Sequence, residues 1–112
     1  MTPTDLLTDL RVMISDENSA RWTDATLRAY MYDTELAIVG AHPEAQYETA
    51  GRVTRVTVSS LSSNSSSFTV DSGYRTAMLH GTAFRVFMGD GDDAANQKLA
   101  QDHFKLFQEA LK

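Results

Sequence analysis

Apolar residues return every three or four positions in four stretches of this chain. Such spacing places them on one side of a helix, so each stretch is typical of a helix that buries one face. Polar residues, glycines and prolines interrupt the pattern between the stretches. We therefore predict four helices, at about residues 3–15, 24–41, 72–89 and 93–111.

The first two predicted helices have recognisable end signals. Thr2 can cap the first helix, and Pro3 suits the first helical position. Thr23 is a good N-cap for the second helix. That helix is expected to stop near Gly40, because Pro43 follows shortly after it and cannot continue a helix.

The segment at about residues 47–70 changes period and becomes rich in β-branched residues, which favours two short strands. Between them, residues 59–67 contain seven serines in nine positions. So little apolar surface predicts a mobile loop. We therefore predict a mainly α (α+β) fold, a four-helix bundle-like domain with an inserted short β-hairpin, in which residues 1–112 form a single domain.

More apolar surface is predicted than one small core can cover. The third helix has two apolar faces, one with Phe84 and Met88 and the other with Leu79 and Phe87. A helix of this kind is buried in a bundle or in a contact between subunits. An isolated β-hairpin is also only marginally stable and needs something to pack on. The third helix favours self-association, and the hairpin is expected to pack on the helices or to pair with another chain.

The stretch "GDGDDAANQ", residues 89–97, is the strongest candidate for a special loop. A calcium loop starting at Asp90 would need glutamate at its twelfth position, where the chain has Gln101. The match to a glycine-rich phosphate loop follows a helical pattern instead of a strand, and its aspartates would repel phosphate. The stretch is best explained as the turn of an αα-hairpin, in which a glycine ends one helix and an aspartate caps the next.

Composition narrows the possible functions. The chain has 112 residues, a net charge of −5, no cysteine and no basic run. This excludes disulfides and thiolate metal sites, and it disfavours nucleic-acid binding. No apolar run is long enough to span a membrane, and the N-terminus does not resemble a secretory signal.

Recognisable catalytic chemistry is missing from the sequence. The histidines at positions 42, 80 and 103 have no i, i+4 pairing and no HExxH motif, so a zinc site has little support. There is also no nucleophile elbow. We expect no catalytic, cofactor-binding or metal-binding residues, and a protein that is not an enzyme.

Two long segments carry a resemblance to a known family. "RWTDATLRAYMYDTELAIVGAHPEA" and "AMLHGTAFRVFMGDGDDAANQKLAQDHFKLFQEALK" resemble the small head–tail adaptor (connector) proteins of tailed bacteriophages. The most specific parts are Arg21-Trp22-Thr23-Asp24, the His42-Pro43 turn and the last helix pair. The match is one of pattern, without a catalytic motif, and the serine-rich middle does not contribute to it.

The resemblance implies a structural virion protein at the head–tail junction, made in the cytoplasm of a bacterial host. It implies a homo-oligomeric ring of about twelve copies, a dodecamer. Such a ring binds the portal protein, extends the DNA channel and offers a docking surface to tail or nozzle proteins, while DNA passes through without specific binding. The alternative is a small non-enzymatic regulatory or antitoxin-like module that binds another protein.

Three groups of residues are candidates for contacts with other chains. The predicted strands could pair with a neighbour by β-augmentation, and the third helix could supply a second face. The last helix could embrace the portal, although its regular apolar stripe favours a role in the core. The candidate interface residues are Val53, Val56, Val58, Phe68, Val70, Leu79, Phe87, Phe104, Phe107 and Leu111.

Overall fold

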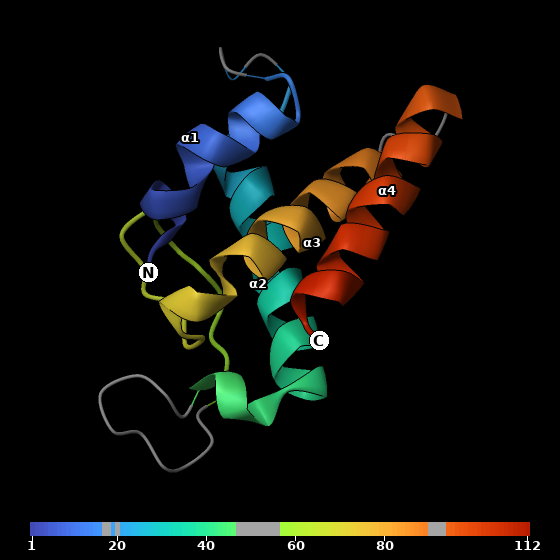
Figure 1. The fold of residues 1–112 in the computed structure, drawn as a ribbon. Coiled ribbons are helices and arrows are strands. Elements are labelled where there is room, and N and C mark those ends of the chain that lie inside the picture. The colour runs from blue at the N-terminus through green and yellow to red at the C-terminus, as the bar shows by residue number, and fades with distance from the viewer. Residues whose placement is uncertain (17–18, 20, 47–56, 90–93) are drawn as a thin grey trace.

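A computed structural model describes residues 1–16, 19, 21–46, 57–89 and 94–112. It contains four α-helices, as the sequence predicts, and each boundary lies within three residues of the expected one (Figure 1). Two short 3₁₀ turns precede the serine-rich segment and α3. The elements are α1 (Pro3–Met13), α2 (Asp24–Ala41), η1 (Pro43–Gln46), η2 (Ser72–Tyr74), α3 (Arg75–Gly89) and α4 (Ala94–Ala110).

Local signals set the ends of α1 and α2. The Thr2 backbone N–H donates to the Asp5 carboxylate over 2.8 Å, so an acid in the first turn satisfies the helix start. The Thr23 hydroxyl accepts from the Thr26 backbone N–H, as expected for an N-cap. α1 ends earlier than predicted because Ser15 takes the left-handed backbone conformation, with φ of 58°.

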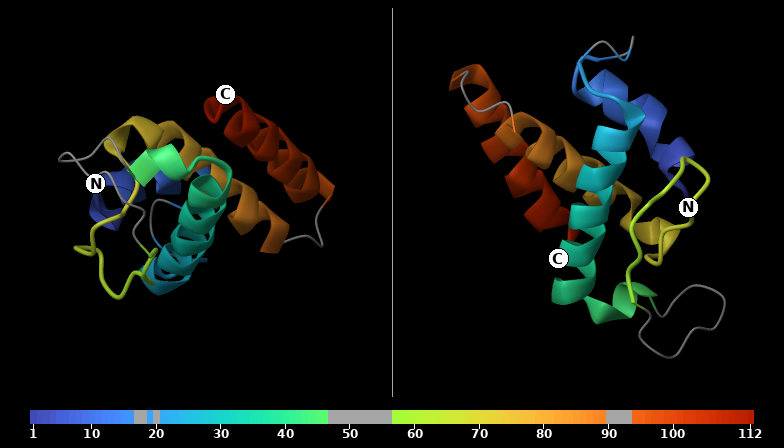
Figure 2. Two further views of the ribbon diagram at one scale, coloured as in Figure 1. Left: turned by 90° about the horizontal axis from the view of Figure 1, so that it is seen from below. Right: turned by 180° about the vertical axis from the view of Figure 1, so that it is seen from behind.

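Helix α3 is the central element. It packs against α1 and α2 on one side and against α4 on the other. The α3–α4 contact is the most extensive between any two elements, and the two helices run antiparallel side by side (Figures 1 and 2). Among the described residues, no comparable contact joins α4 to α1 or α2.

The core lies where α1, α2 and α3 meet. Its members are large apolar side chains that are spaced four, seven or eight residues apart on each helix, which explains why the helical periodicity was visible in the sequence. The most deeply buried are Leu6, Leu10, Leu27, Met31, Ile38, Met78 and Val86.

The predicted inserted β-hairpin is not supported. Residues 57–70 are described, and they form bends and turns but no strand. Val58, Phe68 and Val70 bury their side chains in the helical core. β-branched and aromatic residues therefore serve as anchors of an irregular segment that runs along the helices. The first predicted strand, including Val53 and Val56, lies outside the described residues.

The backbone of this segment finds its partners among the helices instead of in a strand. The Thr69 and Val70 N–H groups both donate to the carboxylate of Glu35 on α2, over 2.6 and 3.2 Å. The Phe68 N–H donates to the Met1 carbonyl. These bonds satisfy donors that a β-ladder would otherwise have used.

The serine-rich loop makes contacts with the helices at its tip, and its predicted mobility stays a prediction. Asn64 is its anchor: its carbonyl accepts from the Thr4 N–H over 3.1 Å, and its side chain bridges Arg28 and Asp24 of α2. Leu61 is buried beside it. One amide side chain and one apolar side chain are enough to hold a segment made mostly of serine.

The stretch between α3 and α4 lies partly outside the described residues, at 90–93. Gly89 is the last residue of α3 and Ala94 is the first of α4. The segment therefore joins two antiparallel helices. In the described part of the chain, no helix is both long enough and apolar enough to cross a membrane.

Candidate functional site

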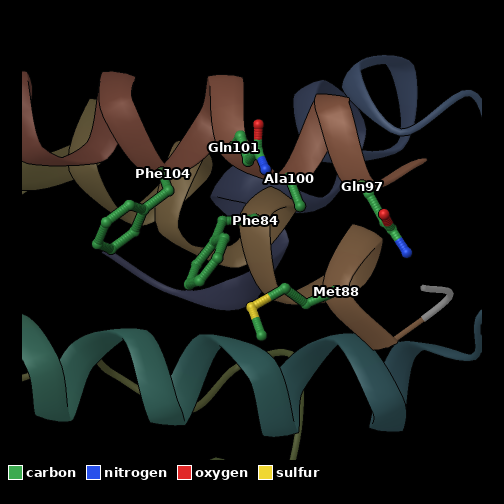
Figure 3. A pocket seen from close by; sticks show the side chains of 6 residues that line it. All are labelled: Phe84, Met88, Gln97, Ala100, Gln101 and Phe104. Atoms are coloured by element: carbon green, nitrogen blue, oxygen red, sulfur yellow. The ribbon is translucent and has the colours of Figure 1, made fainter. Parts of the chain in front are cut away.

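A groove lies beside the α3–α4 pair, and we call it the α3–α4 groove. Its volume is about 380 Å³. Figure 3 shows the side chains of Phe84, Met88 and Phe104 projecting from the two helices into the same space. The lining residues are Phe84, Met88, Gln97, Ala100, Gln101 and Phe104.

The groove exposes more apolar surface than its surroundings. Met88 is 59% exposed and Phe104 is 39% exposed. The Phe84 and Phe104 rings are in tilted contact, with centroids 4.8 Å apart, so they form one continuous aromatic surface. Gln97 and Gln101 give it a polar rim. An apolar centre with a polar edge is typical of a site that binds another macromolecule.

The groove stays open because, among the described residues, α4 makes extensive contact with α3 alone. Of its residues, only Ala100 and Phe107 are buried. Leu99 and Leu106 remain 40% and 42% exposed. The apolar stripe of α4 is thus wider than the strip that α3 covers.

Phe107 marks the place where α4 approaches most closely. Its ring packs over Gly81 of α3, where an added Cβ would lie 2.8 Å from the Phe107 ring and 2.5 Å from Thr34 of α2. Glycine therefore brings three helices together at this level. The sequence left open whether Phe107 belongs to the core or to an interface, and the structure places it in the core.

Most of the predicted interface residues are inside the single chain. Val58, Phe68, Val70, Leu79 and Phe87 are all buried. Leu111 is partly buried against the core, and of the described candidates only Phe104 reaches the groove. The side chains of the buried residues are not accessible to a partner in this conformation.

Sequence reasoning did not single out Phe84, Met88 or Ala100 as site residues. The signal was present, because Phe84 and Met88 shared one of the two apolar faces of the third predicted helix. The sequence did not indicate that α4 packs against Phe87, which belongs to the other apolar face of α3. The position of α4 depends on how it crosses α3.

A buried ion-pair network joins α1 to α2. Arg11 of α1 donates to the Asp16 carboxylate over 3.1 Å, to the Trp22 carbonyl over 3.1 Å, and to the Asp24 carboxylate. The Asp16 carboxylate in turn accepts from the Arg21 and Trp22 backbone N–H groups. The string Arg21-Trp22-Thr23-Asp24, which is one of the most specific parts of the family resemblance, thus has a structural role at the α1–α2 connection.

Glu35 is the most buried acid of the described chain, at 1% exposure. Burial raises the pKa of Glu35, although the hydrogen bonds from Val70 and Thr69 oppose the rise. Its Oε1 atom is buried with no hydrogen-bond partner. This carboxyl ties residues 69–70 to α2, which gives it a structural role.

Comparisons of the chain with protein-family models, with characterised proteins and with solved structures found no significant match. The fold itself defines the class as a mainly helical protein with four α-helices. The function must therefore be argued from the groove and from the sequence.

Proposed function

We propose that this protein is a head–tail adaptor of a tailed bacteriophage, a structural virion protein that forms a ring between the portal and the tail. The observation that supports it best is the open α3–α4 groove, in which the Met88 and Phe104 side chains remain partly exposed. The family resemblance suggests which assembly the chain forms, and the groove offers a surface through which copies of the chain can bind one another.

A ring needs two different contact faces on each subunit, because its interfaces are head-to-tail. The α3–α4 groove offers one of them. Val12 on α1 is 57% exposed and contributes apolar surface on a helix that has no extensive contact with α4. An exposed apolar side chain on a second helix is compatible with a second contact face.

The charge of the chain suits a channel through which DNA moves. With a net charge of −5 and no basic run, the ring would not hold the phosphate backbone. DNA would therefore pass without specific binding, as the proposed role requires.

Native mass spectrometry of the chain, alone and with its cognate portal ring, tests the proposal. We expect a closed multimer of about twelve copies on the portal. A stable monomer or dimer that ignores the portal would overturn it.

The second candidate is a small regulatory or antitoxin-like protein that binds another protein. The same groove favours it, because an apolar groove between two helices accepts the apolar face of a partner helix. It predicts a stable dimer or monomer that forms a defined complex with one protein, and no assembly on a portal.

A further inference from the structure

Two histidines that lie 23 positions apart in the sequence meet at the α3–α4 contact. His80 of α3 and His103 of α4 place their Nδ1 atoms 3.0 Å apart. Their rings meet edge to edge, with centroids 5.2 Å apart and planes inclined by 28°. The Phe87 ring also packs against the His103 ring, with centroids 5.6 Å apart and planes inclined by 12°. The imidazoles are therefore held in place by a neighbouring aromatic ring.

At this separation the two Nδ1 atoms share one proton. One ring donates and the other accepts, since two N–H groups cannot face each other so closely. Burial lowers the pKa of His80. Burial also lowers the pKa of His103, as does the charge of His80, while Asp102 acts in the opposite direction. Both rings are consequently neutral at neutral pH, which is the form that binds metals.

We propose that His80 and His103 form a binding site for a divalent transition-metal ion of the Cu²⁺, Ni²⁺ and Zn²⁺ class. The donating ring moves its proton from Nδ1 to Nε2, so that both Nδ1 lone pairs become available and no net proton is released. Metal–imidazole bonds of about 2.0–2.1 Å place adjacent nitrogen ligands roughly 3.0–3.4 Å apart. The distance of 3.0 Å between the two Nδ1 atoms falls at the edge of that range.

The composition of the site sets its selectivity. In the described part of the chain, no third histidine, aspartate or glutamate completes a cluster around the pair. Water must fill the remaining positions, and both histidines are partly exposed, so it can reach them. Imidazole nitrogen suits copper, nickel and zinc, whereas magnesium and calcium prefer oxygen. We expect binding in the order Cu²⁺, then Ni²⁺ and Zn²⁺, and none of Mg²⁺.

The position of the pair gives the metal a structural effect. The ion would cross-link α4 to α3, the helix that makes nearly all of the contacts of α4. Because the metal binds the folded form, the melting temperature should rise as the metal concentration is increased. This inference is independent of the proposed role in a phage particle.

Isothermal titration calorimetry of the untagged full chain with Ni²⁺ and Cu²⁺ tests the site. We expect one ion per chain, and an affinity at least about tenfold lower in His80→Gln and in His103→Gln, which corresponds to 1.4 kcal/mol. The third histidine provides the control. His42 lies beyond the end of α2 and pairs with Glu44, so His42→Gln should bind as the unchanged protein does.

A measurement on the unchanged protein tests the site even if the variants do not fold. Electron paramagnetic resonance of the Cu²⁺ complex should show coupling to two imidazole nitrogens, and acidification that protonates the pair should abolish it. The proposal is overturned if one-to-one binding is not found, if binding survives both substitutions, or if His42→Gln weakens binding as much as His80→Gln does.

Discussion

Gly81 shows how much a single missing side chain can determine. An alanine there would place its Cβ 2.5 Å from Thr34 and 2.8 Å from Phe107, both closer than packed atoms allow. We expect Gly81→Ala to destabilise the protein by about 1–3 kcal/mol, because the helices must move apart. Gly40 is also helical, but it has no neighbour within 4 Å of the Cβ position, so Gly40→Ala should stabilise by about 0.5–1 kcal/mol. Urea denaturation of both variants measures the difference, and equal effects would contradict the close packing.

Glu35 gives a pH dependence that can be predicted in sign. Its pKa in the folded state is raised above the ordinary value of 4.5. The stability contributed by the protonated form is therefore complete below about pH 4.5 and is lost as the pH rises through the folded pKa. Glu35→Gln cannot ionise. As the pH rises above 4.5 and through the folded pKa, we expect the unfolding free energy of the unchanged protein to fall relative to that of Glu35→Gln.

The comparison with Glu35→Gln isolates this group from others that titrate. Asp24 has a lowered pKa, first because of its hydrogen bond to Arg11, so the stability that it contributes is lost only as the pH falls below 3.8. His80 and His103 titrate alike in both proteins. A constant difference between the two proteins over this interval would show that Glu35 is not buried as described.

At the scale of elements, helices were predictable from sequence because their signals are local. Periodic apolar residues and caps such as Thr23 act within one or two turns. The segment 57–70 was wrongly assigned to a hairpin because its structure depends on distant groups. Nothing near Thr69 and Val70 in the sequence indicates that the Glu35 carboxylate accepts hydrogen bonds from their N–H groups. Only part of the groove could be predicted: the sequence indicated the apolar face of α3 with Phe84 and Met88, but not how α4 crosses α3.

The connection between α1 and α2 allows a graded test of burial. Arg11 pairs with two acids, of which the Asp16 side chain is 3% exposed and the Asp24 side chain is 44% exposed. Asp16→Ala leaves a buried guanidinium without its main partner and should cost about 3–5 kcal/mol. Asp24→Ala removes a more exposed partner and should cost about 1 kcal/mol or less. Thermal unfolding of the two variants checks the order, and a reversed order would contradict the network.

At the scale of the whole molecule, assembly should depend on the α3–α4 groove. We expect Phe104→Glu to place a charge in its aromatic centre and to abolish ring formation on the portal. Leu106 is the matched control, since it lies on the same helix, is similarly exposed and does not line the groove. Leu106→Glu should assemble normally in the same native mass spectrometry experiment. Loss of assembly in both variants would point to a general effect on α4.

The attachment of residues 57–70 also determines the order in which the chain folds. The α3–α4 pair is local in sequence, whereas the bonds Thr4–Asn64 and Glu35–Thr69 close loops of 60 and 34 residues. Contacts that close long loops form late in folding, because closing a long loop costs conformational entropy before the new contacts can stabilise it. Glu35→Ala should therefore leave the refolding rate nearly unchanged and accelerate unfolding, by about tenfold for each 1.4 kcal/mol lost. Stopped-flow measurements of the folding and unfolding rates of both proteins would show whether the Glu35 carboxylate slows unfolding.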